Sequence, residues 1–82
     1  MIIVDIRVPA LEKVYNFSVE EMAKVSDLIE EVVELVCQKE HLAFNGNLEE
    51  MVLCSVEGGV QCDRNKCLND YGITGGSELI LM

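Results

Sequence analysis

The sequence predicts an α+β domain in which one helix packs on one face of a mixed sheet of four to five strands. Residues 2–8 and 13–19 alternate apolar and polar side chains, residues 26–40 follow helical spacing, and residues 78–82 are apolar after Glu78. A period of two is typical of half-buried strands, and a period near 3.6 is typical of an amphipathic helix. A helix and a sheet that each have one apolar side bury those sides against each other.

The chain has 82 residues, which predicts a single domain over residues 1–82. Fifteen acidic and six basic side chains give a formal net charge of −9, while half of the residues are hydrophobic. This apolar content excludes a disordered acidic chain. The scarcity of Lys and Arg argues against nucleic acid and against anionic membrane surfaces as ligands. The composition therefore favours a small module that contacts another protein and is not an enzyme.

The first two predicted strands, residues 2–8 and 13–19, form a hairpin. In the first strand Asp5 and Arg7 share one side, and the apolar residues of alternate positions take the other. Pro9 ends this strand because proline cannot donate a hydrogen bond to a sheet. The connection that follows is short, which favours antiparallel pairing of the two strands.

The predicted helix begins at Ser26 and runs to about Glu40. Ser26 is a favourable N-cap residue, and acidic residues follow it where the helix dipole favours negative charge. The predicted apolar stripe consists of Leu28, Ile29, Val32, Leu35 and Val36. Asn45-Gly46 offers an alternative stop, which would extend the helix to Phe44. If the helix ends earlier, Leu42 and Phe44 anchor a loop onto the core.

Three further strands are predicted at residues 51–56, 60–62 and 78–82. Glu57-Gly58-Gly59 and Gly75-Gly76 are predicted turns that lead into the second and third of them. The last strand has no polar residue after its start, which is typical of a strand flanked on both sides. The first and last strands are therefore expected to lie side by side in parallel, since the chain between them is long enough for a crossover.

The segment Leu68-Asn69-Asp70-Tyr71-Gly72-Ile73 before the last strand resembles the Leu-x-Asp-Tyr-x-Ile stretch of ubiquitin-like domains. This resemblance implies the β-grasp fold, with Leu68 and Ile73 directed into the core. The chain also resembles the YukD/EsaB family in its length and in the stretch Leu68-x-Asp70-x-Gly72-Ile73-Thr74-x-Gly76. That family is associated with type VII secretion in Gram-positive bacteria. The resemblance implies an accessory or regulatory component of the secretion machinery that works through protein contacts.

Ubiquitin and the sulfur carriers of the same fold end in a flexible Gly-Gly tail that is activated at its carboxyl terminus. This sequence stops at Met82, within the predicted last strand, and its two Gly-Gly pairs are internal. We therefore expect a module that is not conjugated to other proteins. A sulfur carrier or protein modifier whose tail is missing from this sequence is the alternative hypothesis.

The four cysteines and the single histidine predict no catalytic site, no metal site and no bound cofactor. Cys37, Cys54, Cys62 and Cys67 lack the paired C-x₂-C spacing of a structural zinc site. His41 has no recognisable nucleophile or acid partner. We expect reduced thiols that pack in or near the core, with Cys62 facing inward. A Cys-based metal or redox protein is a third hypothesis, in which Cys62 and Cys67 lie close enough to cross-link on oxidation.

No segment predicts export or insertion into a membrane. The opening Met1-Ile2-Ile3-Val4 has no basic residues and meets Asp5 at once, unlike a signal peptide. No apolar run approaches the ~20 residues that span a bilayer. We therefore expect a cytoplasmic protein.

The most informative predicted feature is the side of the sheet that faces away from the helix. If Leu53, Leu79 and Leu81 point toward the helix, the residues between them point away. The expected outward apolar set is Ile3, Val52, Cys54, Val56, Ile80 and Met82. Ubiquitin recognises partners with the corresponding face, and an exposed apolar patch marks a contact site. We predict that this set contacts a protein, either a secretion component or a second copy, unless the third strand is shifted by one residue.

The acidic side of the predicted helix is a second, weaker contact candidate. Its charged and polar residues are Asp27, Glu30, Glu31, Glu34 and Gln38. Charge of one sign steers an oppositely charged partner and raises its association rate. The simpler interpretation of this side is a solubilising surface.

Overall fold

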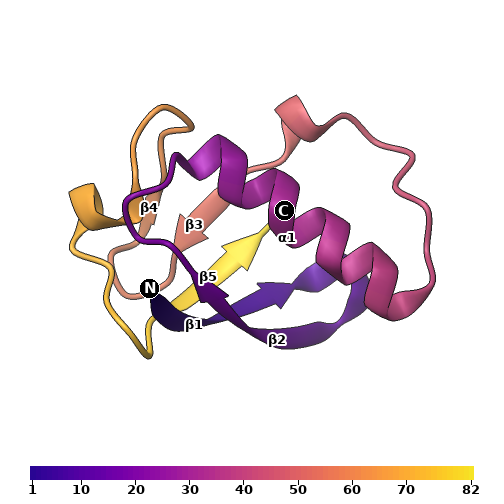
Figure 1. Ribbon diagram of the computed structural model, residues 1–82, viewed down its shortest axis with the longest axis horizontal. Coiled ribbons are helices and arrows are strands. Elements are labelled where there is room, and N and C mark those ends of the chain that lie inside the picture. Colours follow the sequence, from indigo (N-terminus) through magenta and orange to yellow (C-terminus); the bar gives the residue numbers. More distant parts are fainter.

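The computed structural model describes residues 1–82 and shows one α-helix lying across one face of a twisted sheet (Figure 1). The elements are β1 (Ile2–Val8), β2 (Lys13–Val19), α1 (Val25–Glu40), β3 (Leu53–Ser55), β4 (Val60–Gln61) and β5 (Glu78–Leu81). Three short 3-10 turns are η1 (Pro9–Leu11), η2 (Leu48–Glu50) and η3 (Leu68–Tyr71). The five strands follow the order β2-β1-β5-β3-β4. This arrangement confirms the predicted α+β class and the β-grasp fold.

The two central strands, β1 and β5, are parallel neighbours, as predicted. β1 pairs antiparallel with β2, with Ile2 opposite Val19 and Val8 opposite Lys13. On its other side β1 pairs parallel with β5, which in turn pairs antiparallel with β3. β5 thus has a strand on each edge, but only one of its faces is buried: Leu79 and Leu81 face the core, whereas Ile80 does not.

The core lies between α1 and the inner face of the sheet. Seventeen buried apolar residues form one cluster there, and burying a large side chain of this kind stabilises the fold by about 1.5–3 kcal/mol. The buried residues of the helix are Val25, Leu28, Ile29, Val32, Val33 and Val36. The predicted stripe is wrong at Leu35, which is 42% exposed. Leu35 lies at the edge of the stripe, where it lines a hollow with Tyr15 and Phe17 of β2.

The start of α1 differs from the prediction, because Ser26 is not the N-cap. Lys24 occupies the N-cap position, and its side chain makes no capping hydrogen bond. Instead, the amide of Val25 donates to the carbonyl of Lys66 at 2.8 Å, and the amide of Ser26 donates to the carbonyl of Arg64 at 3.1 Å. A loop distant in sequence therefore satisfies two of the amides that have no partner within the helix.

α1 ends at Glu40 and does not continue to Phe44. His41 adopts the left-handed conformation with φ of 56°, and the amide of Leu42 donates to the carbonyl of Cys37 at 2.9 Å. This local geometry ends the helix before the alternative stop at Asn45-Gly46 is reached. Leu42 is 49% exposed and Phe44 is 37% exposed, so the expected anchoring of this loop is only partial.

The segment that resembles ubiquitin-like domains forms η3 and its exit turn. Leu68 and Ile73 are buried, as the resemblance implies. Gly72 follows η3 with φ of 67°, a left-handed conformation that glycine adopts without a side-chain penalty. Asp70 accepts hydrogen bonds from the amide and the thiol of Cys67, and the amide bond is the main reason that its pKa is lowered.

The third predicted strand is shorter in the structure than its sequence pattern, because β3 spans only Leu53–Ser55. Its pairing nevertheless continues beyond these bounds. The amide of Val52 donates to the carbonyl of Met82 at 2.8 Å, and the amide of Met82 donates to the carbonyl of Val52 at 2.9 Å. Leu53 is 2% exposed and faces the core, so the predicted inward and outward sides of this strand are correct.

Candidate protein-contact surface

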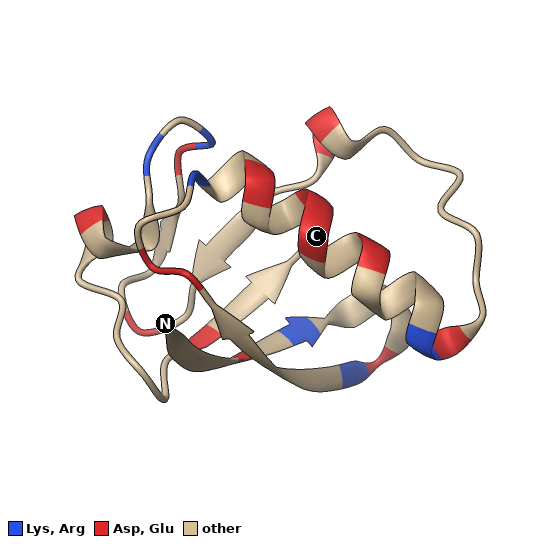
Figure 2. Ribbon diagram, in the orientation of Figure 1, with Lys and Arg blue, Asp and Glu red and all other residues tan.

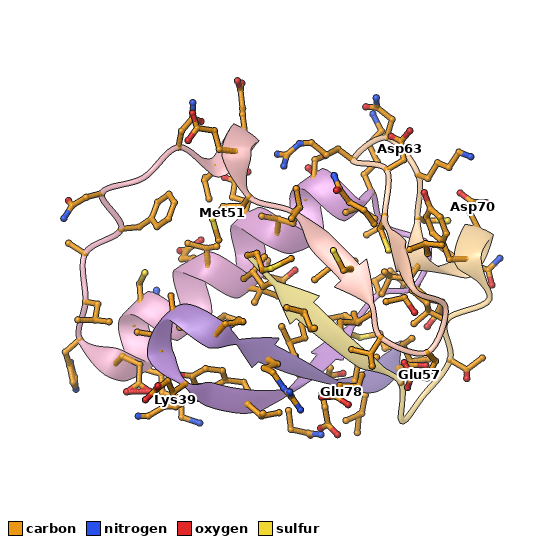
Figure 3. All side chains as sticks on the ribbon, turned by 180° about the vertical axis from the view of Figure 1, so that it is seen from behind. Lys39, Met51, Glu57, Asp63, Asp70 and Glu78 are labelled. Carbon is orange, nitrogen blue, oxygen red and sulfur yellow. The ribbon has the colours of Figure 1, made fainter.

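The outer face of the sheet, turned away from α1, is built by the alternation of side chains along β5 and β3. Leu79 and Leu81 are buried under α1, so Ile80 and Met82 take the opposite side. Leu53 and Ser55 are likewise buried, which places Cys54 on the same outer face as Ile80. Figure 3 presents this face, with the sheet in front of the helix.

Four of the predicted contact residues form one continuous surface, which we call the outer apolar block: Val52, Cys54, Ile80 and Met82. Cys54 lies directly opposite Ile80 in the pairing of β3 with β5. Val52 and Met82 form the next outward pair, held by their two mutual backbone hydrogen bonds. Val52, Cys54 and Ile80 are partly exposed and Met82 is 56% exposed, so a partner can reach all four.

Val56 extends this block at one end. Its amide donates to the carbonyl of Glu78 at 3.1 Å, which places Val56 beside the start of β5. Its side chain is 43% exposed. The carboxylate of Glu57 accepts a hydrogen bond from the amide of Glu78 at 2.9 Å, so acidic groups border the block here.

Ile3 also faces outward but lies apart from the other five. Asp5 is opposite Glu78 in the pairing of β1 with β5, and Ile3 lies two residues further from Ile80 along β1. Nη2 of Arg7 is 2.6 Å from Oε1 of Glu78, so an ion pair lies between Ile3 and the outer apolar block. Ile3 is 54% exposed, so a partner can reach it, but it is not part of the outer apolar block.

Gln61 belongs to the same surface but was not among the predicted contact residues. It lies opposite Cys54 in the pairing of β3 with β4, and it is exposed. Its amide group offers both a hydrogen-bond donor and an acceptor at the edge of the outer apolar block. The inward prediction for Cys62 implied that Gln61 points outward, but the predicted contact set was confined to apolar side chains and therefore omits this glutamine.

The four cysteines and His41 are distributed over α1 and its C-cap, β3, and the segment from β4 to η3. All four cysteines are free thiols, and no group of three or more Cys, His, Asp or Glu side chains is placed to hold a metal ion. Burial raises the pKa of the Cys62 thiol, with a smaller contribution from Cys54. A raised thiol pKa keeps Cys62 protonated, and the protonated form is a weak nucleophile and a weak metal ligand.

The outward side of α1 carries the second contact candidate. Figure 2 shows acidic positions along α1, whereas β3 carries no charged residue. Asp27, Glu30, Glu31 and Glu34 are exposed, and none of them belongs to the three ion pairs of the structure. α1 lacks the length and apolar character needed to cross a membrane, and no other helix has them.

The two internal Gly-Gly pairs lie in turns, as predicted. Gly58-Gly59 connects β3 to β4, and Gly75-Gly76 precedes β5. Gly59 has φ of 62° and Gly76 has φ of 87°, so each pair contains one residue in a conformation that favours glycine.

No protein-family model matches this sequence, and no curated protein matches it. Solved structures do. The ubiquitin-like domain of Arabidopsis thaliana protein At2g32350 has a TM-score of 0.73 and 26% identity, over 99% of this chain and 74% of that chain. The N-terminal ubiquitin-like domain of the 4931431F19Rik protein has a TM-score of 0.72 and 20% identity, over 99% of this chain and 72% of that chain. A designed protein based on ubiquitin has a TM-score of 0.73 and 18% identity, over 99% of this chain and 85% of that chain.

These comparisons show that the chain has the fold of ubiquitin-like domains over nearly its whole length. A domain of this kind suggests a protein-interaction module. The aligned structures share the arrangement of strands and helix, and it is this arrangement that places the outer apolar block on an open face of the sheet.

Proposed function

We propose that this chain, which has a ubiquitin-like fold, is a cytoplasmic protein-interaction module that binds a protein partner through the outer apolar block and Val56. The observation that carries the proposal is the continuous pairing of Cys54 with Ile80 and of Val52 with Met82 on an open sheet face. An exposed apolar patch bordered by polar groups is typical of a protein contact site.

The mechanism of this module is burial of the block against a partner, without catalysis or conjugation. The side chains of Ile80 and Val52 supply apolar area, and the Arg7–Glu78 ion pair and Gln61 supply polar groups at the rim. Polar rim groups contribute to orientation and specificity more than to affinity. The acidic surface of the chain disfavours nucleic acid as the partner.

The finer proposal is an accessory or regulatory role in a type VII secretion system, with a component of the secretion machinery as the partner. It is supported by the resemblance of Leu68, Asp70, Gly72, Ile73, Thr74 and Gly76 to the YukD/EsaB stretch. Reciprocal capture of this chain and the secretion ATPase from native lysate would test it. Capture of partners without any secretion component would replace the finer proposal while leaving the coarser one.

The contact site is tested by substitutions on the outer face. Ile80→Asp and Val52→Asp place a charge within the apolar block, and we expect each to abolish partner capture while the circular-dichroism spectrum stays unchanged. Met22→Asp is the matched control, because Met22 is 62% exposed in the turn between β2 and α1, away from the block and its rim. Full capture by the Ile80 and Val52 variants would refute this site. An intact native mass that includes a Gly-Gly tail would favour conjugation or sulfur carriage instead.

A further inference from the structure

An apolar cavity opens between the C-terminal half of α1 and the segment that follows it, on a different surface from the outer apolar block. Its volume is about 190 Å³, and eleven of its twelve lining residues are hydrophobic. Principal lining residues are Val33, Cys37, Leu42, Phe44, Met51 and Leu81. Leu81 faces inward from β5, whereas Ile80 faces outward, so the sheet separates the cavity from the block. Figure 3 labels Met51, which lies on the segment that returns from α1 to β3.

The size of the cavity indicates the kind of group that fits it. Pockets for cofactors and drug-sized ligands occupy about 300–1,000 Å³, which is larger than this cavity. A dry apolar cavity of about 150 Å³ accommodates a benzene molecule. The space therefore matches one Leu, Phe or Trp side chain rather than a cofactor.

The mouth of the cavity exposes large apolar side chains to solvent. Leu42 is 49% exposed and Phe44 is 37% exposed. A second hollow lies next to the first and shares Val33, Cys37, Leu42 and Phe44 with it. Together the two hollows form one groove along α1, which we call the helix–loop groove.

The rim of the helix–loop groove is acidic. Glu30 and Glu34 of α1 line the second hollow, and Glu49 and Glu50 lie on η2, which also contacts α1. All four carboxylates are exposed and none forms an ion pair. The formal net charge of the chain is −9, so a second copy would be repelled by this acidic rim. A basic segment would be attracted to it.

We infer that the helix–loop groove binds a basic partner segment that inserts one Leu, Phe or Trp side chain into the cavity. Lys or Arg residues beside that anchor pair with Glu30 and Glu34 on the rim. The inserted side chain supplies most of the affinity, because a single buried anchor dominates contacts of this type. The charges set the orientation and the association rate.

A random library of short peptides displayed on phage, selected against the folded chain, tests this inference. We expect the selected peptides to share one Leu, Phe or Trp flanked by Lys or Arg. Their binding is expected to shift the amide signals of Phe44 and Cys37 in an NMR titration. Leu42→Asp is expected to weaken binding about tenfold or more, since it places a charge at the cavity mouth, and Leu42 is exposed enough for the fold to tolerate it.

A matched pair of charge reversals on α1 separates rim contacts from general attraction. Glu34→Lys is expected to weaken binding about three- to tenfold, whereas Glu31→Lys, outside the groove lining, leaves it within about twofold. Equal effects of the two reversals would overturn the inference. Peptides that shift the amide signals of Ile80 and Cys54 instead would also overturn it. So would a selection in which no peptide binds the native chain more tightly than Leu42→Asp, or a self-association of the chain that Leu42→Asp abolishes.

Discussion

The hydroxyl of Tyr15 donates a hydrogen bond of 2.7 Å to Oε2 of Glu40, which joins strand β2 to the last turn of α1. Nζ of Lys13 lies 2.8 and 2.9 Å from the two carboxylate oxygens of the same glutamate. The ammonium of Lys39 lies 5.5 Å from the centroid of the Tyr15 ring. Among the side-chain hydrogen bonds, only those made by Glu40 connect the helix to the hairpin. One carboxylate therefore receives every side-chain hydrogen bond that links the last turn of α1 to the hairpin.

This carboxylate predicts a loss of stability in acid. Hydrogen bonds from Lys13 and then Tyr15 hold the pKa of Glu40 below its ordinary value. The unfolded chain binds the proton more readily, so the stabilisation is complete above the unfolded pKa and is lost as pH falls through the folded pKa. Urea midpoints measured from neutral pH to about pH 2 should fall less steeply for Glu40→Gln than for the native chain. Glu34→Gln, which removes an unpaired carboxylate, is the control, and an equal change in both variants would contradict this assignment.

The same contact predicts a loss of stability in alkali. Burial of the Tyr15 side chain, with the hydrogen bond and charge of Glu40, raises the pKa of its hydroxyl from 10.0 to about 12. Between these values the unfolded chain has already lost the proton that the folded chain keeps, so stability falls as pH rises. Tyr15→Phe removes the ionisable group, and we expect it to flatten the alkaline part of the urea-midpoint curve. An unchanged alkaline slope in this variant would show that another group is responsible.

The Gly75-Gly76 turn predicts opposite outcomes for two adjacent substitutions. Gly76 has φ of 87°, so Gly76→Ala should lower the free energy of unfolding by about 1–2 kcal/mol. Gly75 has no positive φ, and a Cβ there would have only the carbonyl of Ile3 nearby, at 3.9 Å. Gly75→Ala should therefore be neutral or stabilising by about 0.4–1 kcal/mol. Urea denaturation of both variants distinguishes them, and equal losses would contradict the turn geometry.

The start of α1 predicts that Ser26→Ala has little effect. Ser26 lies inside the helix, where Ala has the higher helix propensity, and the backbone bond from its amide to Arg64 does not depend on its side chain. We expect a change in unfolding free energy within about 0.5 kcal/mol. Asn47→Ala is the comparison, since the Asn47 side chain accepts a hydrogen bond from the amide of Glu49 at 2.9 Å. A loss near 1 kcal/mol at Ser26, typical of a deleted N-cap, would restore the original assignment.

The strands were predictable because their periodicity is local, whereas the ends of α1 were not. The alternation in residues 2–8 and 13–19 needs only neighbouring residues to be recognised, and β1 and β2 have these bounds. The start of α1 depends on the carbonyls of Arg64 and Lys66, which no pattern near Ser26 reveals. Its end depends on His41 adopting a left-handed conformation that the sequence favours more strongly at Asn45-Gly46.

The sequence predicted which residues of the candidate site point outward, but not which of them lie next to one another. The alternation around Leu79 and Leu53 gave the correct side for Ile80 and Cys54. Ile3 is separated from the outer apolar block because the pairing of β1 with β5 places Asp5 and the Arg7–Glu78 ion pair between Ile3 and the block. The helix–loop groove depends on where residues 42–51 return to α1. Connecting segments of this length lack the periodicity that would indicate their path.

The backbone bonds from Val25 and Ser26 to the loop at Lys66 and Arg64 also have a consequence for folding, because they join the start of α1 to residues about forty positions later. The amino-terminal half contains the complete hairpin and all of α1, but the carbonyls that accept from the first amides of α1, and the parallel partner of β1, come from the last third of the sequence. Such sequence-distant pairings slow folding relative to helical bundles. During synthesis, one edge of β1 therefore has no strand partner until β5 has been made.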